Sequence, residues 1–568
     1  MAEDDKLSEV EHIKIKSRGL RGEIAQTLAD EQAVKFSDED EQLVKFHGFY
    51  QGYNRDTATA RKKQKLDKEW EMMVRVKVPA GRLTPEQYLA LDKLADPCGN
   101  GTLRVTSRQG MQFHNVFKGN LQKLIGEINA AMMTTFGGCG DVVRNVIADV
   151  SPVDNPVHRE LAETAKKISD ATLPATKSYH EIWVDGEKQK TGGEEPLDPL
   201  YGKQYMPRKF KIALTLPEDN TVDVLTNDVG LIAVVENGTI AGYNVYLGGG
   251  FGMKHNNDKT YPRMASPICY VPAKDVLEIV RASIFLQRDH GDREDRQHAR
   301  LKYVVEEKGI VWTKKTLDGY FGRETDAPRP LPPLKVKDHL GWNDQGNGLF
   351  YFGLPVTSGR IRDYGNEKLR TAIREVVTAF KTPLVLMPTE DVLFCDIKNE
   401  DKPKIEKIFR DHHVPLKEDH LPVELFAMSC VALPTCGKAL AEGERARVPI
   451  VSMVADVLKK YNLAQERLSV RITGCPNGCS RPFTGDIGIV GRAPDLYAVF
   501  IGGDFEGTRL SSKVADKVKT GDIGKFLDPF FAAFAKERAN DNEGFGDFCN
   551  RIGIARLQEL SAASGVAS

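Results

Sequence analysis

The sequence predicts a multidomain protein of the α/β (α+β) class, in which one small and one large α/β unit each occur twice with approximate two-fold pseudosymmetry. Strand-like and helix-like segments alternate along the chain, one strand–turn–helix pattern recurs, and two long inserts resemble each other. The 568 residues are too many for a single core, and length alone suggests roughly three or four domains.

The repeated pattern begins with an alternating strand that reaches Val78 and ends in a Pro-Ala-Gly turn, after which Thr84 and Pro85 open a helix. A second copy begins at Gly348, and its turn is two residues longer. Because a long insert separates the copies, the pattern indicates a duplicated domain pair rather than a solenoid. The matching residues are Pro79, Gly81, Arg82 and Leu83 in the first copy and Pro355, Gly359, Arg360 and Ile361 in the second.

The inserts also resemble each other, because residues 227–252 and 485–507 share an Asp-apolar-Gly-apolar-apolar run, a turn, a strand with a tyrosine, and a Gly-Gly pair. A stretch rich in proline, glycine and charge is the expected linker between the halves. We therefore expect an extended N-terminal arm (1–65), a first small domain (66–135), a first large domain (136–317), a linker (318–344), a second small domain (345–418) and a second large domain (419–568).

The composition is that of an ordinary globular protein, with 28% charged residues, 41% apolar residues and a net charge of -1. This balance gives no reason to expect nucleic acid or a membrane surface as a partner. No apolar run approaches the ~18 residues that span a bilayer, and the acidic N-terminus lacks the apolar core of a secretory signal, so we expect a cytoplasmic protein. Five scattered cysteines are expected to be buried thiols: Cys98, Cys139, Cys269, Cys395 and Cys549.

The other four cysteines form two close pairs. Cys430 and Cys436 have C-x5-C spacing, and Cys475 and Cys479 have C-x3-C spacing within TGCPNGCSR. Four cysteines are the usual ligands of a [4Fe-4S] cluster, whereas structural zinc usually shows C-x2-C pairs. Spacing alone favours a cluster and leaves zinc or coincidence as alternatives.

The combination of C-x5-C with TGCPNGC resembles the motif of siroheme-dependent sulfite and nitrite reductases, and most closely the hemoprotein subunits of assimilatory sulfite reductases. The resemblance covers nearly the whole chain, including the two halves and the segment NEGFGDF. It implies ferredoxin-like small domains and larger domains that bind siroheme and the cluster. It also implies that Cys479 is both a cluster ligand and the axial ligand of the siroheme iron.

The implied reaction is the six-electron reduction of sulfite to sulfide in sulfate assimilation and cysteine biosynthesis, with nitrite as a secondary substrate. No G-x-G-x-x-G fingerprint follows a strand, so a flavoprotein subunit or ferredoxin is expected to supply electrons. Ferredoxin-nitrite reductase is the alternative within the family, although such relatives usually have asparagine at the position of Lys211. A non-catalytic Fe–S electron carrier and a zinc-stabilised binding module are alternatives from other classes.

An anionic cofactor and an anionic substrate require local cations, and the first half contains several basic strings. Lys209 and Lys211 alternate with Phe210 on a predicted strand, so both lysines should face one side. The resemblance implies a catalytic set of Arg75, Arg144, Lys209 and Lys211, and cofactor contacts from Arg104, Thr106, Arg108, Gln112, His114, Arg208, Arg300 and Lys302, with Arg293 and Arg296 as further carboxylate partners. With the cations in one half and the cysteines in the other, the active site should lie where the two large domains meet.

One further expectation concerns Tyr50 in HGFYQ and Cys139 in GGCGDVVRNV. By resemblance, both segments come near the siroheme face. Some ferredoxin-dependent members of the family join a tyrosine and a cysteine from these regions through a thioether bond. A covalent link, simple proximity and no relationship are therefore all open for this pair.

Overall fold

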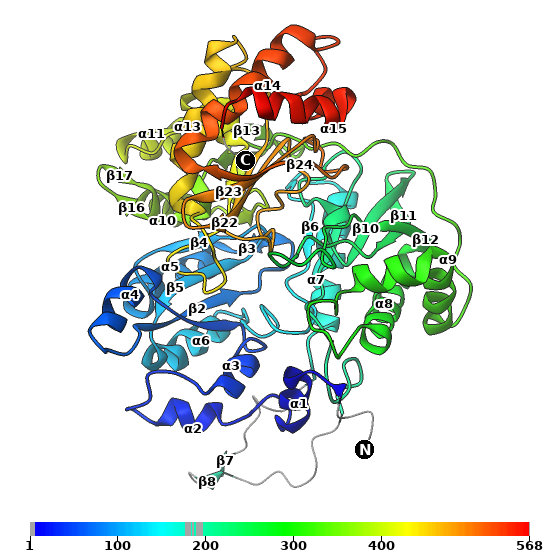
Figure 1. The fold of residues 1–568 in the computed structure, drawn as a ribbon. Helices are drawn as coiled ribbons and strands as arrows, with labels where there is room; N and C mark the ends of the chain where they lie inside the picture. The colour runs from blue at the N-terminus through cyan, green and yellow to red at the C-terminus, as the bar shows by residue number, and fades with distance from the viewer. Residues whose placement is uncertain (1–5, 176–182, 185–186, 189–196, 567–568) are drawn as a thin grey trace.

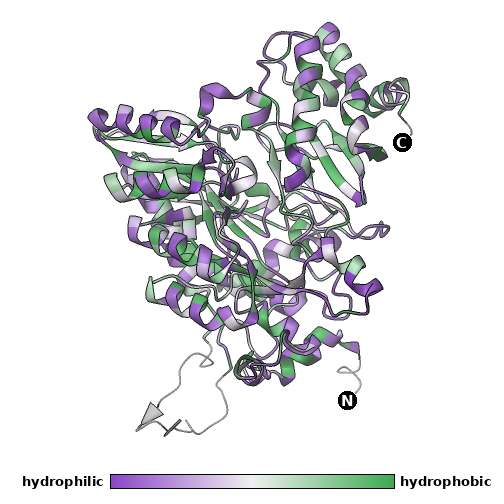
Figure 2. Cartoon of the chain, turned by 90° about the vertical axis from the view of Figure 1, so that its left-hand side faces the viewer, coloured by the Kyte–Doolittle hydropathy of each residue, from purple (hydrophilic) through white to green (hydrophobic). Residues whose placement is uncertain are grey.

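The computed structural model describes residues 6–175, 183–184, 187–188 and 197–566. In this part of the chain, four five-stranded sheets form the framework, and helices cover them (Figure 1). Green, apolar segments are concentrated in the central strands, and purple, polar segments are frequent on the outer helices (Figure 2). No described helix combines the length and the apolar character that crossing a membrane requires.

The two small sheets exchange one short strand each. The strand that follows the first Pro-Ala-Gly turn joins the sheet of the second half, and its counterpart joins the sheet of the first half. Gly81 and Gly359 make the two turns possible, since both have left-handed backbones, with φ of 70° and 67°. The first sheet has the order β1 (Phe49–Tyr53), β2 (Trp70–Val76), β5 (Met111–Val116), β4 (Leu103–Val105), β15 (Arg360–Ile361), and the second has the order β13 (Gly341–Asp344), β14 (Phe350–Leu354), β19 (Val392–Ile397), β18 (Leu384–Leu386), β3 (Arg82–Leu83).

The helices of the small domains begin as their sequences predict. Thr84 accepts a hydrogen bond from the backbone N–H of Gln87 at 3.2 Å and caps the first of them, with Pro85 at the first helical position. One apolar core contains residues of both small domains, so the two units are packed together rather than separate. Their main helices are α5 (Pro85–Cys98), α6 (Leu121–Ala130), α10 (Leu369–Phe380) and α11 (Lys402–Asp411).

The two large sheets have the same topology, with two parallel pairings followed by two antiparallel ones. The last helix of each large domain is broken by a glycine at the same relative place, Gly309 with φ 78° and Gly553 with φ 77°. The sheets are β6 (Ile147–Ala148), β9 (Ile212–Thr215), β10 (Val229–Glu236), β11 (Thr239–Leu247), β12 (Ser266–Pro272), and β20 (Met428–Ser429), β21 (Val470–Thr473), β22 (Ile487–Ala493), β23 (Leu496–Ile501), β24 (Ser512–Lys519). Their helices are α7 (Pro156–Ala171), α8 (Val276–His290), α9 (Leu301–Phe321), α13 (Glu444–Lys460), α14 (Ile523–Glu537) and α15 (Phe545–Ala563).

The N-terminal arm is helical rather than extended, which corrects the expectation from its charged composition. Ser37 caps one of its helices by accepting from the N–H of Asp40, and Leu20, Phe36 and Phe46 are buried.

The linker is shorter than predicted, because α9 ends at Phe321 and β13 begins at Gly341. The remaining elements are α1 (Glu9–Lys16), α2 (Ile24–Ala29), α3 (Asp38–Val44), α4 (Arg55–Lys63), α12 (Pro422–Leu425), β7 (Trp183–Val184), β8 (Glu187–Lys188), β16 (Asp363–Tyr364) and β17 (Glu367–Lys368).

Candidate active site

The four cysteines lie just beyond the carboxyl ends of two neighbouring parallel strands. Cys430 follows β20, and the loop with Cys475 and Cys479 follows β21. The backbone N–H of Gly474 donates to the Cys430 sulfur at 3.2 Å, and the side-chain amide of Asn477 donates to the Cys475 sulfur at 3.4 Å. Donors aimed at sulfur stabilise thiolates, as ligand sulfurs require.

The pKa values of the thiols indicate that they lie near one another. Burial raises the pKa of Cys430, and the neighbouring Cys479 raises it further. Burial and Cys479 also raise the pKa of Cys475 to about 11 and that of Cys436 above its usual value. Among the described residues, no three His, Cys, Asp or Glu side chains could hold a single metal ion. In a [4Fe-4S] cluster each cysteine binds a different iron, so this donor set fits a cluster without converging on one ion.

A row of polar side chains crosses the first small sheet towards the cysteines. The strand register aligns Arg75 with Gln112, Gln112 with Arg104, and Arg104 with Arg360. With its amide oxygen towards Arg75, Gln112 accepts from the guanidinium at 2.7 and 2.9 Å. His114 lies next to Gln112 at 3.2 Å, and burial followed by the charges of Arg360 and Arg104 holds its pKa well below the usual value.

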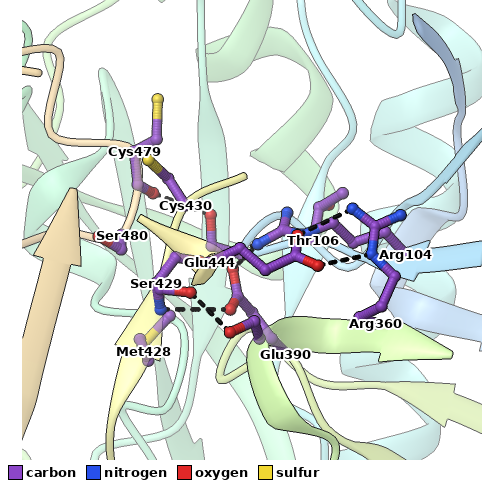
Figure 3. A network of polar contacts seen from close by, with 12 residues as sticks. Arg104, Thr106, Arg360, Glu390, Met428, Ser429, Cys430, Glu444, Cys479 and Ser480 are labelled. Atoms are coloured by element: carbon purple, nitrogen blue, oxygen red, sulfur yellow. Dashed lines mark hydrogen bonds and ion pairs between the residues drawn. The ribbon is translucent and has the colours of Figure 1, made fainter. Parts of the chain in front are cut away.

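Arg104 lies where this row meets the cluster loops (Figure 3). Its guanidinium donates to Glu390 at 3.0 Å and to the backbone oxygen of Ser429 at 2.8 Å, and it lies 3.5 Å from Glu444. Ser429 directly precedes Cys430, so Arg104 holds the backbone beside a predicted cluster ligand. Thr106 accepts from the backbone N–H groups of Arg108 and Gly110 and thereby holds the turn between β4 and β5.

Tyr50, Arg75, Cys139 and Arg144 form a second group. Arg75 donates to the Cys139 sulfur at 3.3 Å, and its guanidinium lies 5.9 Å from the centre of the Tyr50 ring. Burial and the neighbouring Cys139 raise the pKa of Tyr50, and a hydrogen bond from Arg144 opposes the rise. The structure therefore brings the tyrosine and the cysteine of the predicted pair close to two predicted substrate cations.

Lys209 and Lys211 lie near enough to the exposed Cys479 for its thiol to influence their pKa values. Phe210 between them is buried, but the strand predicted for these residues is wrong, because β9 begins only at Ile212 and Phe210 forms an isolated bridge with Val143. The backbone oxygen of Phe210 accepts from the N–H of Arg144 at 2.9 Å. Burial and then the charges of Arg300 and Arg208 lower the pKa of Lys209 to about 7, while the Cys479 thiol acts in the opposite direction. Burial, Lys209 and Arg108 hold the pKa of Lys211 well below its usual value, again against Cys479.

The two halves are also joined by direct contacts at this point. Ser107 donates to the backbone oxygen of Cys479 at 2.9 Å, and the N–H of Met253 donates to the oxygen of Pro476 at 3.1 Å. Ser107 belongs to the first small domain and Met253 to the first large domain, so both units of the first half contact the loop of Cys479. The location of the active site between the two large domains stays a prediction.

Several predicted cofactor contacts are held by groups of the chain itself. Arg300 forms a bidentate pair with Asp228 at 2.9 and 2.8 Å, and Lys302 donates to the backbone oxygen of Gly252 at 2.9 Å. Arg108 donates to Asn227 at 2.8 Å and to the backbone oxygen of Asn145 at 2.6 Å. Arg208, Arg293 and Arg296 belong to a charge network with Asp141 and Glu11.

Asp223, Arg471 and Arg481 also lie at the meeting of the halves, and sequence reasoning missed them. Asp223 pairs with Arg471 at 2.6 Å and with Arg481 at 3.1 Å. The signal for Arg481 was its place two residues after Cys479, whereas Asp223 and Arg471 gave no local signal.

The residues present fit an anionic macrocycle beside a four-cysteine cluster. The lowered pKa values of Lys209 and Lys211 arise partly from neighbouring cations, which is the signature of a site short of negative charge. In the described part of the chain, Arg108 Nε and His114 Nδ1 are buried without a hydrogen-bond partner, and both are of the donor type that a carboxylate accepts from. Siroheme, with its several carboxylates, would satisfy both the charge and the donors.

Fold and site together define a redox protein that holds an iron–sulfur cluster and an anionic cofactor between two duplicated halves. Family models described as the nitrite/sulfite reductase ferredoxin-like half domain and the nitrite and sulphite reductase 4Fe-4S domain match residues 65–131 and 163–325. The second match lies in the first half and contains none of the four cluster cysteines, as duplication of the domain allows.

The chain belongs to the nitrite and sulfite reductase family. It is 40% identical to the sulfite reductase (ferredoxin) of Synechococcus elongatus, over 99% of this chain and 92% of that protein. It is also 40% identical to the sulfite reductase (NADPH) hemoprotein beta-component of Geobacillus kaustophilus, over 98% of this chain and 97% of that protein. The structure of the Mycobacterium tuberculosis NirA protein has the same fold, with a TM-score of 0.76, 22% identity, and coverage of 96% of this chain and 95% of that one.

Proposed function

We propose that this protein reduces sulfite to sulfide with six electrons at a siroheme linked to a [4Fe-4S] cluster, in the assimilation of sulfate and the biosynthesis of cysteine. The observation that carries the proposal is that Lys209 and Lys211 of the first half lie close enough to Cys479 of the second half for its thiol to influence their pKa values. An electron carrier that performs no chemistry has no use for two lysines at that position. Full-length relatives named as sulfite reductases support the same function.

Cys430, Cys436, Cys475 and Cys479 would hold the cluster, and Cys479 would also ligate the siroheme iron. When bound, the cluster and siroheme supply electrons one at a time to the substrate. Arg75, Arg144, Lys209 and Lys211 would bind the anion and stabilise negative charge that develops on oxygen. Lys209, with its pKa lowered to about 7, is suited to donate protons near neutral pH as oxygen leaves as water.

Siroheme carboxylates would be bound by the cationic and polar groups around this centre, including the unpartnered nitrogens of Arg108 and His114. Gln112 and Arg104 contribute by holding Arg75 and the residue before Cys430. The remaining contacts of this set are proposed for Thr106, Arg208, Arg300 and Lys302.

The electron donor is proposed to be either ferredoxin or a flavoprotein that oxidises NADPH, since relatives of both types share about the same identity with this chain. Nitrite is proposed as a secondary substrate, and the cytoplasm as the compartment. Ferredoxin-nitrite reductase is the second candidate function, and the second lysine at Lys211 favours sulfite, whose charge exceeds that of nitrite.

The proposal is tested by the sulfide that the purified holoenzyme forms from sulfite, with reduced methyl viologen as an artificial donor. Sulfide formation with a kcat/KM for sulfite above that for nitrite is the expected result. Preference for nitrite would favour the second candidate, and no turnover of either anion would favour a carrier. Repeating the assay with reduced ferredoxin and with NADPH plus a flavoprotein identifies the donor.

We also propose that Tyr50 and Cys139 form a thioether next to the anion site. The two side chains influence each other electrostatically and share Arg75 as a neighbour, which supports proximity but not the bond itself. Formation of the carbon–sulfur bond releases one hydrogen from the Tyr50 ring and one from the Cys139 thiol, that is two protons and two electrons, and dioxygen would accept them and become hydrogen peroxide. Mass spectrometry of the holoenzyme should show the two peptides joined through a bond that reductant does not break; a Cys139 that is freely alkylated after unfolding excludes it.

A further inference from the structure

The N-terminal helix α1 places two charged side chains in the protein interior. Glu11 and Lys14 are each 1% exposed. Lys14 donates to the backbone oxygen of Met206 at 2.8 Å, and the N–H of Ser8 donates to the backbone oxygen of Arg293 at 2.9 Å. The helix is thus fixed to the segment that leads directly into Arg208, Lys209 and Lys211.

Asp141 connects this helix to the anion site. Its carboxylate lies 2.7 Å from Arg296, 3.7 Å from Lys14 and 3.9 Å from Arg208. Its backbone oxygen accepts from the N–H of Met206 at 3.0 Å. Asp141 also lies between Cys139 and Arg144 in the sequence, so it ties the loop of Arg144 to the segment of Lys209.

We propose that α1 is a positioning element of the anion site, and that Lys14 acts on Arg208 through Asp141. This inference rests on the proposed function. Arg296 contacts the Asp141 carboxylate directly at 2.7 Å, while Lys14 at 3.7 Å and Arg208 at 3.9 Å share its remaining negative charge. As long as Lys14 offsets part of that charge, Arg208 is less strongly attracted to Asp141. Arg208 therefore keeps its charge available to an anion bound beside Lys209.

The balance of charge in this network predicts which way Arg208 moves when one of its neighbours loses its charge. Four cations (Lys14, Arg208, Arg293 and Arg296) share two carboxylates, those of Glu11 and Asp141. Removal of the Lys14 charge leaves Asp141 less compensated in a buried place, and Arg208 is the cation that can move towards it. Removal of the Glu11 charge has the opposite effect, because Lys14 then depends on Asp141 alone and Arg208 is released.

The test uses the holoenzyme and two variants of α1 with opposite expected effects. Lys14→Met should weaken sulfite binding by about tenfold, because the movement of Arg208 towards Asp141 takes a positive charge away from the bound anion. Glu11→Gln should bind sulfite as well as the wild type or better. Sulfite binding is measured without turnover, from the change in the visible absorption of the oxidised protein on titration with sulfite.

Arg18→Met is the matched control, because it removes a cation from the same N-terminal arm. Arg18 and its partner Glu23 lie 2.7 Å apart, and both side chains are exposed. The sulfite affinity of this variant should equal that of the wild type. Lys14→Arg, which retains the charge, should restore most of the affinity lost in Lys14→Met. In steady state, Lys14→Met should raise the KM for sulfite by about the same factor as the dissociation constant, with kcat changed less than about twofold.

Three results overturn the proposal: equal sulfite affinities in Lys14→Met and Arg18→Met, equal losses in Lys14→Met and Glu11→Gln, or failure of Lys14→Arg to restore binding. The second of these would mean that α1 only supports the fold. If Lys14→Met does not fold, Glu11→Gln decides alone, and weaker sulfite binding in that variant overturns the proposal. A wild-type protein whose spectrum does not respond to sulfite contradicts the proposed function itself, which distinguishes the two failures.

Discussion

The two halves of this protein have nearly the same architecture and different chemistry. Their large sheets have the same order of parallel and antiparallel pairings, and their last helices break at equivalent glycines, Gly309 and Gly553. The strand ends that carry Cys430 and Cys475 in the second half correspond to those before Asp149 and Leu216 in the first half, where no cysteine is present. Lys211 instead precedes β9, at the opposite end of that strand.

This difference shows how a duplicated fold can divide one reaction between its copies. In the proposed mechanism the second half supplies thiols to a cluster, and the first half supplies cations to an anion. Neither set is complete alone, because the charges that lower the pKa of Lys209 and the thiol that opposes them come from opposite halves. The two copies thus contribute different groups, from different ends of equivalent strands, to one proposed site.

The largest expected effect comes from Cys479→Ser, which removes the thiol proposed to join the two metal centres. We expect loss of siroheme, loss of most of the cluster iron, and turnover at background, because one sulfur holds both groups. Iron, acid-labile sulfide and the siroheme absorption are measured together. Cys269→Ser, in β12 of the first half, is the control and should retain both groups; a normal siroheme spectrum in Cys479→Ser would show that the bridging assignment is wrong.

The next effect concerns Lys211 in the first half, where we place selectivity. Lys211→Asn should lower kcat/KM for sulfite by at least roughly tenfold, or about 1.4 kcal/mol, with a smaller loss for nitrite. The reason is that sulfite presents more negative charge than nitrite and gains more from a second ammonium group. Steady-state assays with both anions check this, and equal losses would assign Lys211 to cofactor binding instead.

A third prediction tests the symmetry of the architecture itself. A Cβ at Gly81 would lie 2.3 Å from the oxygen of Leu386, and a Cβ at Gly359 would lie 2.3 Å from the oxygen of Val105. Gly81→Ala and Gly359→Ala should therefore each lower the free energy of unfolding by about 1–3 kcal/mol, and by similar amounts. Chemical denaturation measures both, with Gly126→Ala in α6 as a control where nothing lies within 4 Å; a large loss in only one variant would break the equivalence of the turns.

The smallest effect is a pH dependence of the cofactor-free protein. Folding lowers the pKa of Lys209 to about 7 and that of Lys302 to about 6, in both cases chiefly through burial, from a usual value of 10.5. Between pH 7 and 9 the unfolded chain therefore binds more protons at these lysines, so stability should rise with pH. The urea midpoint should increase over this interval, and less so in Lys209→Met; a midpoint that falls equally in both proteins would contradict the lowered pKa values.

The sequence alone predicted those features that depend on residues close to one another in the chain. The spacing of the cysteines located four thiols that influence one another in the structure. The alternation around Phe210 predicted its burial, although the strand expected there begins only at Ile212. The Pro-Ala-Gly turn and the Thr84 cap also form as predicted, because turn and cap preferences depend on neighbouring residues.

Long-range pairing could not be predicted in the same way. The exchanged strands β3 and β15 are each two residues long, too short for any periodicity to indicate their partners. Asp228, Glu390 and Asp141 pair with cations distant in sequence, and single carboxylates leave no pattern from which such pairs can be inferred. The helical N-terminal arm was missed because its charged composition hides a small set of buried residues such as Lys14 and Leu20.

The central claim is that the cations of the first half and the cysteines of the second half enclose one siroheme and one cluster at a shared anion site. The visible absorption spectrum of the purified protein, recorded before and after addition of sulfite, tests this claim most directly. The account predicts a Soret band together with a red-shifted chlorin-type band, both of which change on addition of sulfite. A broad iron–sulfur shoulder alone, or a colourless protein, would contradict it.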